Sequence, residues 1–166
     1  MTATDPAMRR RDKRIDDPSE LQRILDEAQV LHLGLVDDGV PYVVPLNFAR
    51  DGDVLWFHCA GEGRKLRCLR VAPQVCVEVE RLIEVTSGSA ACDDWTSHYE
   101  SVIGHGTAVE VGDEAERSRG LQAIMRKYSG RDGWEFPAAD LARTTVVRVT
   151  LESLSGKRSP ASRETP

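Results

Sequence analysis

Residues 30–48, VLHLGLVDDGVPYVVPLNF, decide the fold. Two short apolar runs, residues 30–36 and residues 41–48, stand on either side of the pair Asp38-Gly39. Such a pair is typical of a tight β-hairpin, because both turn residues adopt a positive φ that Asp and Gly tolerate. The stretch therefore predicts two antiparallel strands joined by a short turn.

Further strand-like runs continue this antiparallel pattern along the chain. The expected later strands are residues 54–60, 74–84, 101–111 and 144–151, and the expected helices are residues 18–28, 64–71 and 113–128. Each long helix opens with an aspartate that precedes a glutamate by three positions, which is a capping pattern. The strands follow one another without a βαβ rhythm, so we predict a mainly β fold: a closed or nearly closed antiparallel barrel of six or seven strands, with flanking helices outside it.

Length and composition limit what the chain can be. Its 166 residues suffice for one domain with a core, and 22 basic against 27 acidic residues argue against a nucleic-acid binder. The longest apolar runs are too short to cross a membrane, and no apolar run follows the basic residues 9–14, so neither an anchor nor a signal peptide is expected. The four cysteines form no CxxC pair and match no zinc spacing, which predicts reduced thiols in a cytoplasmic protein and no metal site.

Three segments are expected along the chain. Residues 1–14 have the composition of a flexible basic arm, which in an alternative interpretation folds over an anionic ligand. Residues 15–157 form a single domain, and residues 158–166 form a disordered tail.

The stretch HCAGEGRKL, residues 58–66, has the pattern of an anion site. A strand ends, two glycines turn the chain, and a helix begins with Arg64 and Lys65. A helix N-terminus offers free backbone N–H groups and a partial positive charge, and glycines allow close approach to a ligand. Two cations there are unfavourable for the helix dipole, so an anionic ligand would explain them. The pattern predicts a phosphate site, with a solvated charged turn as the alternative.

Five blocks in a fixed order, spread over roughly residues 8–157, carry a resemblance to a known family. They are MRR at 8–10, GLVDDG at 34–39 with PYVVPLNF at 41–48, FH at 57–58 with EGRK at 62–65, YESV at 99–102 with glycines at 104 and 106, and SGK at 155–157. In these blocks the chain resembles the flavin-binding split-barrel superfamily of pyridoxamine 5′-phosphate oxidase. Within it, the chain is most similar to the nitroimidazole-reductase-like branch.

The resemblance implies a homodimer of six-stranded split barrels, with two flavin mononucleotide (FMN) sites at the subunit interface. Arg64 and Lys65 would hold the phosphate, and Lys157 would add a further phosphate contact. The other residues expected to line the cofactor, from one subunit or its partner, are Pro45, Leu46, Asn47, His58, Ala60, Gly63, Trp95, Tyr99 and Ser101.

His58 is the candidate catalytic residue. The resemblance places it near the flavin ring, where it could donate a proton to a substrate that takes up electrons. The alternative is a histidine bonded to a backbone carbonyl. Cys59 points to the opposite face of the strand, so a Cys/His nucleophilic pair is not expected. Trp95 and Tyr99 are four residues apart, a spacing that places both on one face of a helical turn and fits core packing equally well.

Three functions stay open at this point. The first is a flavin-dependent reductase or oxidase acting on a small, flat, electron-poor compound. The second keeps the fold and changes the ligand to the deazaflavin F420 or to haem, with His58 as the axial ligand. The third is a non-catalytic flavin-binding protein.

Overall fold

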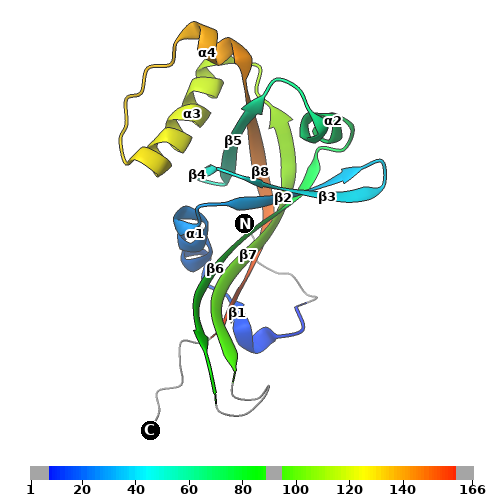
Figure 1. Ribbon diagram of the computed structural model, residues 1–166, viewed down its shortest axis with the longest axis vertical. Coiled ribbons are helices and arrows are strands. Elements are labelled where there is room, and N and C mark those ends of the chain that lie inside the picture. Colours follow the sequence, from blue (N-terminus) through cyan, green and yellow to red (C-terminus); the bar gives the residue numbers. More distant parts are fainter. Residues whose placement is uncertain (1–7, 89–94, 160–166) are drawn as a thin grey trace.

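A long twisted antiparallel sheet with helices on its flanks forms the structure, a computed structural model that describes residues 8–88 and 95–159 (Figure 1). The strands are β1 (Arg14–Ile15), β2 (Leu31–Asp37), β3 (Val40–Leu46), β4 (Ala49–Asp51), β5 (Val54–Ala60), β6 (Gln74–Thr86), β7 (Thr96–Glu110) and β8 (Thr144–Arg158). The helices are η1 (Arg11–Lys13), α1 (Pro18–Glu27), α2 (Arg64–Val71), α3 (Glu114–Ser129) and α4 (Ala138–Arg143). This architecture confirms the mainly β fold with flanking helices.

The strands lie in the order β3-β2-β6-β7-β8-β5-β4, and β1 pairs with β8. Six of the eight strands are long, and β1 and β4 span only two and three residues, so the six strands expected from the resemblance are recognisable. Among the described residues, no ladder joins the outer edge of β3 to β5, and β4 pairs with β5 only as far as Ala49 and Trp56. We call the unpaired edges of β3 and of residues 57–60 of β5 the seam; along it the barrel is split.

Local signals account for the hairpin and the helix starts. Asp38 and Gly39 have φ values of 51° and 80°, as a tight turn between β2 and β3 requires. The Asp17 carboxylate accepts a hydrogen bond from the Ser19 N–H at 2.9 Å, and that of Asp113 accepts one from the Glu116 N–H at 2.8 Å. These contacts satisfy N–H groups that the helices leave without an internal partner.

The helical turn expected around Trp95 and Tyr99 is wrong. Pairing with β6 continues from Thr96 opposite Thr86 along β7, which places Tyr99 within a strand. Pairing with one neighbouring strand gives hydrogen-bond partners to the backbone N–H and C=O groups of every second residue in this segment. A single helical turn would give partners to very few of these groups.

Two clusters of buried side chains stabilise the sheet. The larger fills the inside of the barrel and includes Leu33, Leu55 and Phe57; the smaller lies under α3 and includes Trp56 and Ile124. Successive residues of β5 therefore face alternate sides, as a strand requires.

Both ends of the described chain pack against the sheet. Met8 is only 8% exposed, Arg14 pairs with Lys157, and the Ser159 N–H donates to the Tyr99 carbonyl oxygen at 2.9 Å. Residues 1–7 of the expected arm and residues 160–166 of the expected tail lie outside the described residues. None of the helices in the described part is long and apolar enough to cross a membrane.

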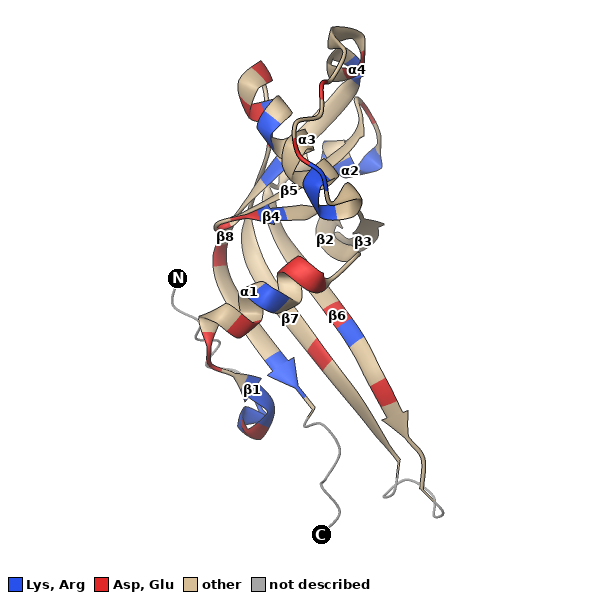
Figure 2. Ribbon diagram, turned by 90° about the vertical axis from the view of Figure 1, so that its left-hand side faces the viewer, with Lys and Arg blue, Asp and Glu red and all other residues tan. Residues whose placement is uncertain are grey.

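A charged network fastens α1 to the end of the sheet opposite α2, where both signs of charge meet (Figure 2). The Glu100 carboxylate, whose side chain is 7% exposed, accepts hydrogen bonds from Arg23 at 2.8 and 2.9 Å and from Arg158 at 2.8 Å. Burial acts to raise the pKa of Glu100, but these two guanidinium groups outweigh it and leave the pKa below its usual value.

The packing of Gly120 generates a stability prediction. A Cβ at this position on α3 would lie 2.6 Å from Cε3 of Trp56 and 2.9 Å from Cγ1 of Val146, both buried. We expect Gly120→Ala to lower the free energy of unfolding by roughly 1–3 kcal/mol through overpacking, although alanine is the better helix former. Urea denaturation measures this. The control is Gly112→Ala, where no atom lies within 4 Å of the added methyl group; equal effects of the two substitutions would contradict the expectation.

Candidate functional site

The seam begins where the chain leaves β3 at Asn47 and Phe48. The buried Phe48 N–H donates to the Tyr128 hydroxyl at 3.0 Å, and this hydroxyl donates in turn to the Gln29 carbonyl oxygen at 2.7 Å. Nζ of Lys127 lies 3.6 Å from the centroid of the Phe48 ring. We call Phe48, Lys127 and Tyr128 the Phe48 clamp. The clamp supplies a hydrogen-bond acceptor for the Phe48 N–H, which would otherwise need a partner on a neighbouring strand. The chain can therefore separate from β5 at this point.

The first turn of α2 lies at the end of the seam and contacts both of its edges. Nε of Arg64 is 2.6 Å from Oδ2 of Asp37, and the guanidinium stacks 4.2 Å from the centroid of the Tyr42 ring, on the β3 side. Nζ of Lys65 lies 5.1 Å from the centroid of the Phe57 ring, on the β5 side. Hydrogen bonding to Asp37 raises the pKa of Arg64. The two cations are therefore divided between the two strands that border the seam.

The backbone at the start of α2 is open to a ligand. Gly63, the residue before the helix, has a φ of 138° and no atom within 4 Å of where a Cβ would stand, and no side chain caps the helix. The Arg67 N–H makes the first helical bond, to the Gly63 carbonyl oxygen at 3.1 Å. The N–H groups of the preceding turn lack an internal partner, which together with Lys65 makes a cradle suited to one phosphate.

His58 lies on the α3 side of β5, on the same face as Trp56. It lines a cavity of about 160 Å³ whose walls are largely apolar. The other lining residues are Leu121, Ile124, Met125, Phe136, Asp140, Leu141 and Thr144. Burial and the positive charge of Lys65 lower the pKa of His58, so the imidazole is neutral at pH 7.

Cys59 packs against the larger core on the opposite face of β5, and burial raises the pKa of its thiol. The arrangement agrees with the expectation that Cys59 and His58 do not form a nucleophilic pair. Cys59, Cys68 and Cys76 are free thiols, and Cys92 lies outside the described residues.

One group of the residues expected at the cofactor lies along the two edges of the seam and at the start of α2. Asn47 and His58 each lie two residues beyond the last β4–β5 pair, and the α2 start lies at the far end of the seam. This group comprises Pro45, Leu46, Asn47, His58, Ala60, Gly63, Arg64 and Lys65. Sequence reasoning missed Asp37, Tyr42 and Lys127 as neighbours of this group, since no motif or spacing relates them to it.

A second group lies elsewhere in the same chain. Ser101 pairs with Lys157, the last residue but one of β8, and this strand ends on the side of the sheet opposite α2 (Figure 1). The ring of Tyr99 lies beneath Nζ of Lys13 at 5.6 Å. Trp95 precedes β7 and is 55% exposed. Ala60, at the seam, pairs with Thr144, the first residue of β8. The length of β8 from Thr144 to Lys157 is roughly 40 Å, so Lys157 lies far from the seam. One chain therefore does not unite the two groups.

Comparison with known families decides the relationship. The sequence profile described as pyridoxamine 5′-phosphate oxidase matches residues 17–158, most of the chain. The chain belongs to this family. The match spans strands β2 to β8 and all the helices from α1 to α4, so its fold is the flavin-binding split barrel.

Solved structures of similar shape support the assignment. A candidate 5-nitroimidazole antibiotic resistance protein from Bacteroides thetaiotaomicron is 27% identical, with a TM-score of 0.78 over 87% of this chain and 85% of that one. An FAD-binding protein from Mesorhizobium loti is 25% identical, with a TM-score of 0.64 over 87% and 96%. The flavocytochrome Anf3 from Azotobacter vinelandii, 23% identical with a TM-score of 0.81 over 99% and 80%, shows the fold alone. No curated protein sequence matches.

The Phe48 clamp generates a prediction for this family member. Tyr128→Phe leaves the ring in place but removes the acceptor of the Phe48 N–H and the donor to Gln29. We expect a loss of roughly 1–3 kcal/mol in the free energy of unfolding, because a buried amide loses its partner. Thermal or urea unfolding measures it, and hydrogen exchange at the Phe48 amide should become faster. Unchanged stability together with unchanged exchange at Phe48 would contradict the role of the clamp.

Proposed function

We propose that the chain binds FMN along the seam and works as a flavin-dependent oxidoreductase that reduces a small, electron-poor compound. The observation that carries this proposal is the position of the α2 start. It presents free N–H groups and two cations at the end of two strand edges that have no partner among the described residues.

The phosphate end of FMN fits the α2 cradle. Arg64 already shares its charge with Asp37, whereas no ion pair among the described residues involves Lys65. An anion at the helix N-terminus would offset both Lys65 and the positive end of the helix dipole. The single cradle suits a mononucleotide, which carries one phosphate group.

The ring of the flavin would lie along the seam. The edge residues Leu46 and Asn47 and the facing residues of β5 can offer backbone N–H and C=O groups to the polar edge of the ring. Pro45 cannot donate, which leaves an apolar contact at its position. This is the arrangement that the resemblance implied for residues 45–47.

We further propose that a second copy of the chain completes each site. Tyr99, Ser101 and Lys157 are too far from α2 to serve the same flavin in one chain, but a twofold axis can bring them to the α2 of a partner. Val43 and Ile103 are exposed apolar side chains on the face of the sheet that also carries Ser101, the face turned away from the larger core. Such exposed apolar side chains favour contact of this face with a second copy.

The chain's own residues would bind, orient and protonate. A bound flavin supplies the electrons. His58 faces a small apolar cavity, so a compact substrate there would be shielded from water on several sides. A protonated His58 could deliver a proton to the reduced substrate, and its lowered pKa would confine this form to acidic solution.

The other ligands have less support from the geometry. Haem on His58 would need more room than the cavity of about 160 Å³ provides, since sites for molecules of that size are usually several hundred Å³. F420 carries a longer anionic tail, which suits a net charge of −5 poorly. A cytoplasmic location remains part of the proposal, and free thiols at Cys59, Cys68 and Cys76 suit a reducing compartment.

Flavin binding tests the phosphate cradle. We expect saturable quenching of FMN fluorescence by the wild-type protein and at least about a tenfold loss of affinity in Lys65→Ala, because one charged hydrogen bond is worth roughly 1.5–3 kcal/mol. Combining it with Arg64→Ala should lower the affinity further. Arg67→Ala, on the exposed side of the same helix, is the matched control. Equal affinity in all the variants, or a haem absorption band in the purified protein, would overturn the FMN proposal.

The pH dependence of turnover tests His58. If its protonated form is the donor, the rate of reoxidation of the reduced, flavin-loaded protein by a nitroimidazole should fall as the pH rises, with a midpoint below the ordinary histidine value of 6.5. His58→Asn should remove this step and slow the reaction by roughly a hundredfold. His105→Ala, a histidine outside the seam, should keep the wild-type profile. A normal rate and profile in His58→Asn with intact FMN binding would exclude the proton-donor role.

A further inference from the structure

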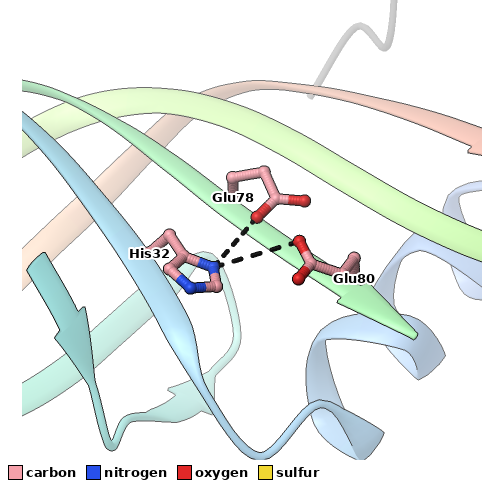
Figure 3. A group of neighbouring side chains, drawn as sticks. All are labelled: His32, Glu78 and Glu80. Atoms are coloured by element: carbon pink, nitrogen blue, oxygen red, sulfur yellow. Dashed lines mark hydrogen bonds and ion pairs between the residues drawn. The ribbon is translucent and has the colours of Figure 1, made fainter. Parts of the chain in front are cut away.

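His32, Glu78 and Glu80 form a cluster on the outer face of the sheet (Figure 3). His32 of β2 is directly opposite Glu78 of β6, and Glu80 follows two residues later on the same face. Nδ1 of His32 lies 3.1 Å from Oε2 of Glu78 and 4.0 Å from Oε2 of Glu80. We propose that this cluster, the β2–β6 triad, binds a divalent transition-metal ion of the Zn²⁺ type.

The surroundings of the triad leave its two carboxylates without a positive partner. Along the same rows of the sheet, Pro45 is the neighbour of His32, Ile103 of Glu78 and Ser101 of Glu80, and all three are uncharged. The next basic residue in the Glu80 row is Lys157, two strands away and thus roughly 10 Å distant. Among the described residues, the two triad carboxylates form ion pairs only with His32.

This environment differs from that of other carboxylates near the sheet. Glu100, which is buried, is held by two arginines. For Glu78, burial and the nearby Glu80 raise the pKa to about 7, because the second carboxylate repels its negative form. A divalent cation between the two carboxylates would supply the charge that the protein does not provide.

The donor atoms are spaced for a metal ion. Tetrahedral zinc with bonds of about 2.0–2.2 Å separates its ligand atoms by about 3.3–3.6 Å. The His32–Glu78 distance is already close to this value. The Glu80 side chain is 56% exposed, so its carboxylate has room to approach, whereas β2–β6 pairing fixes the other two residues.

The chemistry of the donors selects the kind of ion. One imidazole nitrogen with two carboxylate oxygens suits Zn²⁺, Mn²⁺ or Co²⁺, and solvent can complete the coordination. Ca²⁺ and Mg²⁺ prefer all-oxygen sites and are not expected. Metal binding would replace the His32–Glu78 hydrogen bond and link β2 to β6. All three ligands come from one chain, so neither the flavin nor a second copy has to supply a ligand.

Calorimetric titration of the full, tag-free chain with ZnCl₂ under reducing conditions tests the triad. We expect one Zn²⁺ per chain, little competition from excess Mg²⁺, and a Tm rise of roughly 5–10 °C at a hundredfold excess over Kd. His32→Ala and Glu78→Gln should each lower the affinity by at least about tenfold. Their matched controls are His105→Ala on β7 and Glu84→Gln on β6, which should bind like the wild type.

A thiol is the main competing explanation, because Cys76 precedes Glu78 by two residues on the same face. Cys76→Ser should therefore keep full affinity. The absorption spectrum of the Co²⁺-loaded protein should also show visible d–d bands of imidazole and carboxylate ligation, without a sulfur charge-transfer band in the near ultraviolet. Binding that survives in His32→Ala and Glu78→Gln, that disappears in Cys76→Ser, or that Mg²⁺ displaces readily would overturn the proposal. The protein can be titrated with Zn²⁺ both without and with bound flavin. A failure of the metal-site proposal is therefore distinguishable from a failure of the FMN proposal.

Discussion

The hydrogen bond from the Phe48 N–H to the Tyr128 hydroxyl is the contact on which the seam depends. In a continuous barrel this buried amide would belong to a strand ladder. Tyr128, projecting from α3, accepts the bond and passes another to Gln29, just before β2. One hydroxyl therefore ties together three parts of the chain at the point where β3 separates from β5. Leaving the amide without a partner would cost about 1–3 kcal/mol, so the split exists because a side chain replaces the missing strand.

Features that depend on neighbouring residues could be predicted from the sequence. Asp38-Gly39 forms the hairpin turn because only a few residue types tolerate its φ values, and Asp17 caps α1 through an N–H two positions away. The passage from β5 through Gly63 into α2 is equally local, so an uncapped helix start with two cations could be predicted from the sequence. For the same reason the alternation of Cys59 and His58 along β5 followed from the strand period alone.

Features made by distant parts of the chain could not be predicted this way. Asp37, at the end of β2, forms an ion pair with Arg64, whereas no ion pair among the described residues involves Lys65. The sequence separation of Asp37 and Arg64 does not predict this contact. The helical turn near Trp95 failed because long-range pairing of β7 with β6 overrode a spacing of four residues. His32 and Glu78 are likewise joined only by strand register. A zinc site built from two strands of a sheet leaves none of the short motifs that a sequence search recognises.

The outer face of the sheet links the proposed sites. Pro45, His32 and Glu78 are successive neighbours in one row across β3, β2 and β6, so Pro45, which we propose contacts the flavin, lies one strand spacing, roughly 5 Å, from His32 of the β2–β6 triad. Ser101 and Lys157 continue the next row on β7 and β8. Ser101 and Lys157 belong to the same face, so a twofold pairing that carries Lys157 toward the α2 of a partner would bring part of this face close to that partner. The unpaired edges of the seam and the outer face that carries these rows thus belong to the same sheet, whose β2–β3 ladder ends at Leu46.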